Sequence, residues 1–384
     1  MLTSDWIAKS HQKILPIGLD IGHSAIKMVQ LSLSDDGVGV LAFDRAPVDT
    51  DPMMADETRQ QLITRTIQQM LGRTRFKGKE VISALPADKL RITSLRLAEA
   101  ERFDAERALR KEAAHRFGLD ARVDAIKYIL AGSVRQGDEL KSEYIVFATD
   151  EETIRNHITL LEEAGFQPCG IDAGPCALFR NFERLMRRQE DREHTIIFVD
   201  IGHRYTMVAF GRAGEICFVK QMAFGTARFA EDIAGKLGIS TSDAESLRLK
   251  MASDESVDAS TRRLVVDTLH GTAEQLAAEI SLCLRYYTVT FRGKRVERAV
   301  LAGGGVHETA LLDVMRHHLA IETEVAEPLR GFVAGRGDGS AERQTLSADF
   351  ALAVGLSLKG THASMSRAVP SEDRPEPILE GALS

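Results

Sequence analysis

The residues most able to do chemistry in this chain belong to a four-residue sequence, Asp-Ile-Gly-His, that occurs twice. Each copy ends an apolar run, in "IGLDIGHSAIKMVQL" from Ile17 and in "IIFVDIGHRYTMVAF" from Ile196. A carboxylate at the end of a strand can face a divalent cation, and a glycine turn lets backbone N–H groups approach an anion. The pattern therefore predicts two phosphate-binding hairpins, with Asp20 and Asp200 facing Mg²⁺ through water.

Each predicted hairpin offers further groups to a phosphate. Gly22 and Gly202 would form the close turns, and the hydroxyl groups of Ser24 and Thr206 would add contacts. Lys27 would reach a phosphate as a point charge. A single Asp-x-Gly sequence is a common turn, so the interpretation depends on the two copies in matching strand contexts.

A third candidate element is the glycine-rich segment "AVLAGGGVHETALLDVM". An expected strand over residues 299–302 leads into Gly303, Gly304 and Gly305, and a helix to about residue 319 follows. Glycines at a strand-to-helix junction permit the close approach of a flat ring or a phosphate, although a plain tight turn has the same sequence. Competing motifs fail, because "GRTRFKGKE" lacks the P-loop spacing and no Gly-x-Gly-x-x-Gly follows the first strand.

Composition limits the classes of function. The 384 residues suffice for two or more domains, and 44% of them are hydrophobic, which is enough for a real core. A net charge of −7 argues against a broad nucleic-acid surface. No apolar run has the roughly 18–20 residues of a membrane span, and residues 1–16 are too polar for a signal peptide, so a cytosolic protein is expected. The four scattered cysteines are expected to be buried thiols.

The elements that must position these groups follow from hydrophobic periodicity. In the first half we expect strands over 17–20, 25–33 and 81–85, and a helix over 58–71. Residues 90–171 predict strand, helix, strand, strand, helix, strand, which indicates a small inserted α+β unit. In the second half we expect the second hairpin, a helix over 229–237, helical pieces over 240–272, a longer helix over 273–287 and a closing helix over 347–358.

This order predicts an α/β protein of two lobes. The expected division is a leader (1–16), a first lobe (17–89 and 172–193) with the inserted unit (90–171), a second lobe (194–240 and 296–345) with a helical subdomain (241–295), a closing helix on the first lobe (346–360) and a disordered tail (361–384). Residues 335–343 are expected to form a flexible loop.

The two hairpins and the glycine segment, in this order, resemble the actin-like ATPase superfamily. Within it the chain resembles the PilM family of type IV pilus assembly proteins, relatives of the cell-division protein FtsA. The resemblance covers about residues 17–360 and includes "ISALPADKLRITSLRLA", "LLEEAGFQPCGIDAGPCAL", "FGTARFAEDIAGKLGIS", "AESLR" and "ADFALAVGLSLKG". It implies an actin-like two-lobed fold with duplicated β-hairpin phosphate loops and an inserted small α+β subdomain.

The sequence departs from this family at the hairpin turns. The family usually has a small hydroxyl residue where His23 stands, and small or hydroxyl residues around 203–205, where this chain has His203, Arg204 and Tyr205. Arg248 stands where a lysine of the family's "AExxK" approaches the nucleotide, with Glu245 nearby. The resemblance thereby adds four candidate nucleotide contacts, namely His23, His203, Glu245 and Arg248.

The resemblance implies a cytoplasmic scaffold that binds ATP and Mg²⁺ with slow or no hydrolysis. The inserted unit of the scaffold would dock the cytosolic tail of a PilN-like single-pass membrane protein, and this partner would recruit the scaffold to the inner membrane. Other pilus assembly proteins and further copies of the chain are additional expected partners. Two alternatives stay open: a phosphotransferase related to sugar and acetate kinases, and a scaffold that has lost its nucleotide. A kinase needs a positioned base, for which Asp172 is the candidate carboxylate, although helix capping explains it as well.

Overall fold

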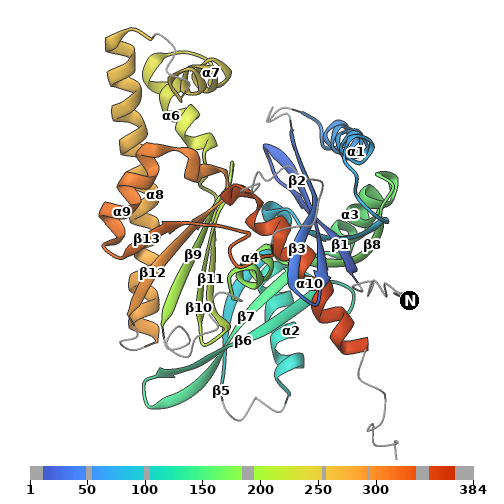
Figure 1. The fold of residues 1–384 in the computed structure, drawn as a ribbon. Helices are drawn as coiled ribbons and strands as arrows, with labels where there is room; N and C mark the ends of the chain where they lie inside the picture. The colour runs from blue at the N-terminus through green and yellow to red at the C-terminus, as the bar shows by residue number, and fades with distance from the viewer. Residues whose placement is uncertain are drawn as a thin grey trace, which may run out of the picture.

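The computed structural model describes residues 12–48, 54–98, 104–183, 194–252, 257–291, 295–333 and 346–367. They form two lobes that stand next to each other, with a smaller unit beneath them (Figure 1). Three sheets carry the fold, one in each lobe and one in the smaller unit. The expected leader up to residue 11, the loop over 335–343 and the tail from residue 368 lie outside the described residues.

The first lobe contains a five-stranded sheet of order β3-β2-β1-β4-β8. Its strands are β1 (Lys13–Ile21), β2 (Ala25–Ser34), β3 (Gly37–Pro47), β4 (Glu80–Ala84) and β8 (Gln167–Asp172). The first three are antiparallel, and β4 and β8 continue parallel to β1. Apolar residues of α1 (Asp56–Arg73) and α3 (Glu151–Glu163) pack on one face of this sheet.

The second lobe repeats this topology. Its sheet has the order β11-β10-β9-β12-β13, built from β9 (Thr195–Ile201), β10 (Thr206–Arg212), β11 (Glu215–Met222), β12 (Val296–Ala302) and β13 (Glu322–Val325). Again three antiparallel strands precede two parallel ones. The helices are α6 (Ala227–Leu237), α7 (Thr241–Ala252), α8 (Ala259–Thr290) and α9 (Thr309–Leu319). The same strand order in both lobes means that one structural unit is used twice.

Helix α8 is longer than the sequence predicts. We expected helical pieces up to residue 272, but a single helix runs from Ala259. The Asp258 side chain accepts a hydrogen bond from the N–H of Thr261 and caps its start. Val265 and Leu269 are buried against the lobe, while the neighbouring Arg263, Asp267 and His270 are exposed. The polar composition of this segment therefore marks an exposed helix face and not a break in the helix.

The inserted unit consists of β5 (Arg91–Ala98), α2 (Ala105–Phe117), β6 (Ala125–Gln136) and β7 (Glu139–Thr149), with strand order β5-β7-β6. Helix α2 covers one face of the sheet and ends at Gly118, whose φ is 65°. The expected end of this unit at residue 171 is wrong, because β8 pairs with β4 and α3 packs in the first lobe. Periodicity predicted α3 and β8 correctly but does not say which sheet a strand joins.

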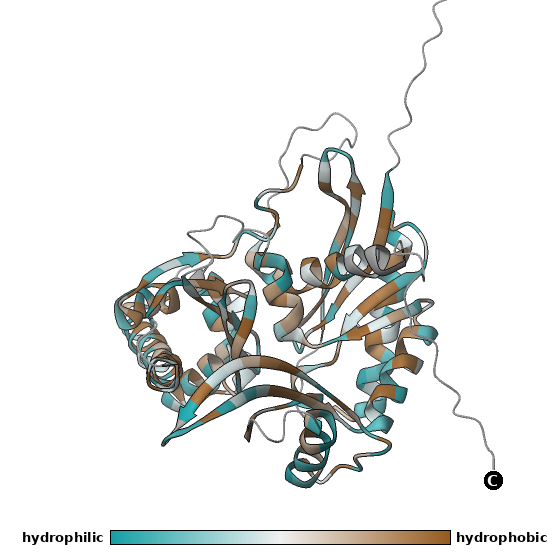
Figure 2. Cartoon of the chain, turned by 90° about the horizontal axis from the view of Figure 1, so that it is seen from below, coloured by the Kyte–Doolittle hydropathy of each residue, from teal (hydrophilic) through white to brown (hydrophobic). Residues whose placement is uncertain are grey.

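The other face of the inserted sheet packs against the second lobe. Residues Ile145 and Phe147 of β7 belong to the same apolar core as Phe218 of β11. Seen from below, the sheet arches beneath both lobes (Figure 2). Arg96 of β5 pairs with the buried Glu143 of β7 at 2.8 Å and also donates a hydrogen bond to the hydroxyl of Tyr286 on α8. The inserted unit is thus joined to the first lobe by its chain connections and to the second lobe by packing.

Helix α10 (Ala351–Arg367) closes the fold by packing on β1 and on α4 (Gly174–Glu183). Two glycines allow this close contact. A Cβ atom on Gly18 would lie 2.0 Å from the carbonyl oxygen of Ala353, and one on Gly355 would lie 1.8 Å from that of Ala177. No larger residue fits at either position without moving a backbone.

The cysteines differ in exposure. Cys217 and Cys283 are buried and Cys176 is half-buried, but Cys169 is exposed, so the expectation of four buried thiols is wrong for that residue. Cys169 belongs to β8, an edge strand of the first-lobe sheet, which explains the exposure. Among the described residues, no helix combines the length and the apolar character needed to cross a bilayer.

Candidate functional site

The two hairpin turns have the same geometry. In the first tip (residues 22–25) the N–H of Gly22 donates to the carbonyl of Ala25 at 3.0 Å, and in the second tip (residues 202–205) Gly202 donates to Tyr205 at 2.9 Å. A Cβ atom on either glycine would lie within 2.8 Å of that carbonyl oxygen. Both turns therefore require glycine, which explains why Asp-x-Gly recurs.

Each tip presents backbone N–H groups that can bind an anion. Within the part of the chain that the structure describes, the N–H groups of residues 23, 24, 203 and 204 donate no backbone hydrogen bond. Successive free N–H groups in a turn form a concave anion-binding surface. The tips lie close together, because the rings of His23 and Tyr205 are 5.5 Å apart between centroids.

Behind the tips lies the interlobe site, a group of charged residues around Asp20 and Asp200. Lys27 is opposite Asp20 in the hairpin register, and its Nζ is 2.9 Å from Asp20 Oδ2. The corresponding position opposite Asp200 is Met207, so only the first hairpin carries a cation there. Asp349 is the third carboxylate; the Ser347 hydroxyl donates to it, and Arg45 Nε lies 3.2 Å away.

The charges of this site shift one another's pKa values. Burial raises the pKa of Asp200 to about 6, and the negative charges of Asp20 and Asp349 add to this while Lys27 opposes it. Burial lowers the pKa of Lys27, but Asp20 and the other two carboxylates outweigh burial and raise it overall. The site therefore carries excess negative charge, which a bound cation would neutralise.

Asp349 is a residue that sequence reasoning missed. It belongs to η4 (Ala348–Phe350), about 150 positions after the second hairpin, and reaches the site only because η4 lies against the glycine segment. The N–H of Gly303 donates to the carbonyl of Ala348 at 3.2 Å. The sequence feature that could have predicted Asp349 is a lone carboxylate in the apolar run "ADFALAVGL", because a charged side chain in such a run needs a partner.

The glycine segment lies directly against the second hairpin. A Cβ on Gly303 would be 2.4 Å from Asp200 Oδ1, and one on Gly305 would be 2.3 Å from Ile201 Cγ2, whereas Gly304 faces open space. Gly303 has a φ of 85°, which also favours glycine. The three candidate elements predicted from the sequence are thus brought together, as the paired-hairpin interpretation requires.

Two side chains predicted to contact the nucleotide, Thr206 and Arg248, instead make contacts within the protein. The Thr206 hydroxyl is buried and donates to the carbonyl of Phe224 at 2.7 Å, so it holds the chain and does not face the tips. In the hairpin register Thr206 is the counterpart of Ile26, and the counterpart of Ser24 is Arg204. The predicted phosphate contact of the Thr206 hydroxyl is therefore taken up by Phe224, and the two hydroxyls stand at different register positions.

Arg248 is also engaged. Its guanidinium pairs with Glu245, with Nε 3.0 Å from Oε2, and it contacts Glu308 as well. Glu308 directly precedes α9, and sequence reasoning missed it. Arg248 thus ties α7 to the segment after the three glycines and does not project freely toward a nucleotide. Burial lowers the pKa of the adjacent His203 to about 4, and its Nδ1 lies 3.3 Å from the Thr226 hydroxyl.

Asp172, the candidate base of the kinase alternative, is engaged in structural contacts. This carboxylate accepts from the N–H of Ala173 at 3.0 Å and pairs with Arg180 and Lys359 at 2.9 and 3.1 Å. These contacts hold α4 and α10 together.

As for metal binding, no group of three or more His, Cys, Asp or Glu residues suited to an ion occurs among the described residues. Two aspartates still match Mg²⁺, which uses one or two carboxylates and keeps several waters.

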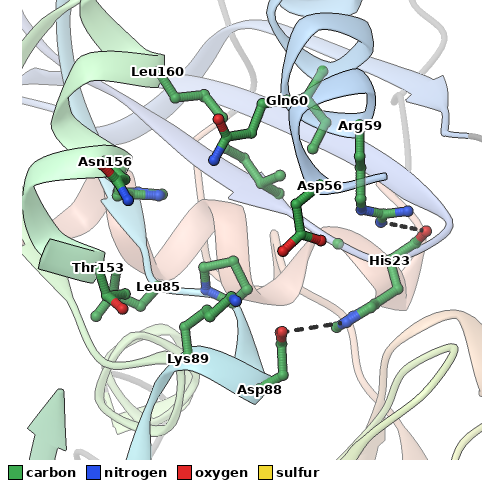
Figure 3. Close-up of a pocket in the computed structure, with 15 residues that line it drawn as sticks. His23, Asp56, Arg59, Gln60, Leu85, Asp88, Lys89, Thr153, Asn156 and Leu160 are labelled. Carbon is green, nitrogen blue, oxygen red and sulfur yellow. Dashed lines mark hydrogen bonds and ion pairs between the residues drawn. The ribbon is translucent and has the colours of Figure 1, made fainter. Parts of the chain in front are cut away.

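A separate cavity of about 320 Å³ lies on the first-lobe side of the first tip. We name it the junction cavity, because its walls are α1, α3 and η1 (Ala87–Lys89), the last of which leads into the inserted unit (Figure 3). Its buried lining residues are the apolar Ile21, Ile63, Leu85 and Leu160 together with His157, and the more exposed ones are mostly polar. Its lining residues are Ile21, Gly22, His23, Asp56, Arg59, Gln60, Ile63, Leu85, Pro86, Asp88, Lys89, Thr153, Asn156, His157 and Leu160.

The side chain of His23 connects the junction cavity to the second tip, because its ring also lies against Tyr205. Its Nε2 lies 3.4 Å from Asp88 Oδ1, and Arg59 donates to its carbonyl at 3.1 Å (Figure 3). Burial raises the pKa of Asp88, but the hydrogen bond and charge of His23, with the charge of Lys89 and a backbone hydrogen bond, together lower the pKa below its usual value. The pair therefore links the first hairpin to the η1 turn.

Two lobes of identical strand order, each with a glycine-turned hairpin facing the other, define an actin-like fold. Residues 18–361 match the family described as type IV pilus assembly protein PilM, and the chain belongs to that family. Among solved structures, the PilM–PilN type IV pilus biogenesis complex is 20% identical, with a TM-score of 0.73 over 90% of this chain and 98% of that one. The ethanolamine utilization protein EutJ from Carboxydothermus hydrogenoformans is 14% identical, with a TM-score of 0.52 over 90% and 89%.

Proposed function

We propose that this chain is a nucleotide-binding scaffold of the type IV pilus assembly machinery, which binds Mg-ATP between its lobes and docks the cytosolic tail of a PilN-like inner-membrane protein. The observation that carries the first part is the pair of facing tips with their free N–H groups, backed by Asp20 and Asp200. Membership of the PilM family supports the second part.

The residues present fit Mg-ATP. The N–H groups of both tips would hold phosphate oxygens, and Lys27 would add its charge once a cation competes for Asp20. Asp20 and Asp200 would hold Mg²⁺ through water, and the cation would neutralise the negative charges that add to burial in raising the pKa of Asp200. The open side of Gly304 would receive the nucleoside. The bound ion would neutralise phosphate charge.

Calorimetric titration with ATP and Mg²⁺ tests this site. We expect binding by the wild type and at least about tenfold weaker binding by Lys27→Met, since a lost charge-assisted contact costs about 1.5–3 kcal/mol. The matched control is Lys236→Met on the exposed face of α6, which should bind like the wild type. No heat at millimolar ATP would favour the scaffold that has lost its nucleotide.

Hydrolysis should be slow or absent. Phosphoryl transfer depends mostly on positioning, including a residue that orients the attacking water. Of the three carboxylates at the interlobe site, Asp20 is engaged by Lys27, Asp349 is engaged by Arg45, and Asp200 is the one proposed to face Mg²⁺. A steady-state rate above about one per second, typical of kinases, would contradict this proposal.

The tail is proposed to bind at the junction cavity. The cavity lies where the chain enters and leaves the inserted unit, and it combines mostly apolar buried residues with more exposed polar ones, which suits one or two side chains of an extended peptide. The solved relative named above is a complex of PilM with PilN. Because the peptide would order on binding, its affinity should be micromolar.

A pair of substitutions on one helix tests the docking site. Thr153→Trp would fill the junction cavity, whereas Thr159→Trp places the same side chain on an exposed part of α3 outside it. Titration with the tail peptide should show at least about tenfold weaker binding for Thr153→Trp only, since an interface residue buried at the centre commonly contributes about 2 kcal/mol. Equal binding by both folded variants would place the tail elsewhere.

Recruitment to the inner membrane would follow from the partner. Residues 1–16, which include Trp6 and Ile7, offer at most a short, weakly basic segment for lipid. Fractionation of cells that lack the other pilus proteins should leave the chain in the soluble fraction. Persistent membrane association in those cells would show that the chain binds lipid itself.

A further inference from the structure

His23 stands between the two proposed binding sites. It belongs to the first tip, its ring lies against Tyr205 of the second tip, and it also lines the junction cavity. Its side chain is only 18% exposed. The two rings therefore bridge the tips at the place where phosphate oxygens would bind.

The η1 turn on the other side of His23 is held by both lobes. Asp88 of this turn pairs with His23, and the carbonyl of Ala87 accepts a hydrogen bond of 2.6 Å from Gln221 on β11 of the second lobe. The turn directly precedes β5, the first strand of the inserted unit. A displacement of His23 would therefore shift the η1 turn, which contacts the first lobe, the second lobe and the inserted unit.

We propose that His23 is the residue through which the tail and the nucleotide oppose each other's binding; this inference rests on the proposed function. Phosphates held by both tips require the imidazole to leave Tyr205. The open space next to the ring is the junction cavity that it lines, on the side of Asp88. A peptide side chain in that cavity takes this space and keeps the ring between the tips.

The linkage must be reciprocal. If the tail lowers the affinity for ATP by some factor, ATP lowers the affinity for the tail by the same factor. We expect a factor of at least about five, at the lower end of usual couplings between sites. The scaffold would then release its membrane partner on binding ATP and release ATP on binding the partner.

The experiment is a set of four titrations on the full chain. ATP with Mg²⁺ is titrated without and with saturating synthetic tail peptide, and the peptide without and with saturating Mg-ATP. In the wild type both ratios of Kd should be about five or more. In His23→Ser, which restores a small hydroxyl residue and removes the ring, both ratios should fall to about one.

The matched control is His203→Ser, because His203 stands at the same position of the second tip but does not line the junction cavity. Its ratios should stay at the wild-type value. Should His23→Ser not fold, Tyr205→Ser gives the ring room to move and should also lower the ratios. Ratios near one in the wild type, a tail that strengthens ATP binding, or full coupling in the folded His23→Ser variant would overturn the inference.

Failure of the proposed function gives a different result. A wild type that does not bind ATP, or does not bind the peptide, contradicts the proposed function and removes the coupling with it. A wild type that binds both ligands independently leaves the proposed function intact and contradicts the coupling alone.

Discussion

At the scale of single residues, the three carboxylates of the interlobe site differ in whether they have a cationic partner. Asp20 has Lys27 and Asp349 has Arg45, but among the described residues no ion pair is formed by Asp200, which is half-buried. Burying a carboxylate without a cation is unfavourable, and this is reflected in its raised pKa. A residue that lowers the stability of the empty protein in this way is typical of a binding site.

The protonation of Asp200 predicts a pH dependence of stability. Because folding raises its pKa from 3.8 to about 6, the protonated form stabilises the fold fully below pH 3.8, and this contribution is lost as the pH rises through about 6. Asp200→Asn should therefore be more stable than the wild type at pH 7.5 without ligand, by about 1–3 kcal/mol, and equally stable at pH 4.

Thermal unfolding between pH 4 and 8 without Mg²⁺ or nucleotide measures this difference. The control is Asp138→Asn, at an exposed residue of the inserted unit, which should follow the wild type at every pH. With Mg-ATP present, the order of Asp200→Asn and wild type should reverse. A wild type more stable than Asp200→Asn at pH 7.5 without ligand would contradict the raised pKa.

Substitutions of Ser24 and Thr206 should separate an effect on ATP binding from an effect on stability. Thr206→Val leaves the half-buried carbonyl of Phe224 without its donor, which costs about 1–3 kcal/mol of stability. Ser24→Ala should change stability little and weaken ATP binding, because Ser24 stands on the first tip. Thermal unfolding and ATP titration of both variants measure this. Stronger loss of ATP affinity in folded Thr206→Val than in Ser24→Ala would reverse the assignment.

At the scale of elements, helix α10 and the glycines beneath it determine how the first lobe closes. The helix packs directly on β1 and α4, because Gly18 and Gly355 have no side chain. Asp172 adds ion pairs to Lys359 on this helix and to Arg180 on α4. The segment before α10 carries Asp349 into the interlobe site, so the placement of this helix also determines the placement of a charge.

Gly355→Ala should destabilise the protein. The added Cβ would lie 1.8 Å from the Ala177 carbonyl, and such overpacking typically costs about 1–3 kcal/mol. Gly235→Ala in α6 is the matched control, since nothing lies within 4 Å of its Cβ and the change favours the helix by about 0.5–1 kcal/mol. Thermal unfolding should show opposite shifts for the two variants. Equal shifts would mean that α10 can move without cost.

At the scale of the whole molecule, the inserted unit connects the two lobes. Its chain leaves and enters the first lobe, while its sheet packs on β11 and α8 of the second. Removal of the unit should therefore end before Glu151, because α3 and β8 belong to the first lobe. Any relative motion of the lobes must shift this packing, so the unit is placed to respond to it.

Arg96→Met should weaken this connection strongly. It leaves Glu143, which is 1% exposed, without its cation, and breaking a buried pair in this way costs about 3–5 kcal/mol. Arg107→Met is the control, because Arg107 is 84% exposed on α2 of the same unit. Chemical denaturation measures the stability, and hydrogen exchange should show loss of protection in β11 for Arg96→Met only. Unchanged exchange there would mean that the unit packs independently of the second lobe.

The sequence by itself determined the local parts of this protein. Glycine turns at Gly22 and Gly202, the alternation of the flanking strands and the end of α2 at Gly118 depend on near neighbours, so they were predictable. The repeat of Asp-Ile-Gly-His indicated a duplicated unit, and the equal strand orders of the two lobes confirm the duplication.

Only the tertiary structure decided which distant groups meet. The sheet that β8 joins, the arrival of Asp349 beside Asp200, the engagement of Arg248 by Glu308 and the contact of His23 with Tyr205 all pair elements that are not neighbours in the chain. Periodicity reports which face of an element is buried but not what covers that face. Partners of charged side chains are chosen by packing, and packing is settled only when the lobes, the inserted unit and α10 come together.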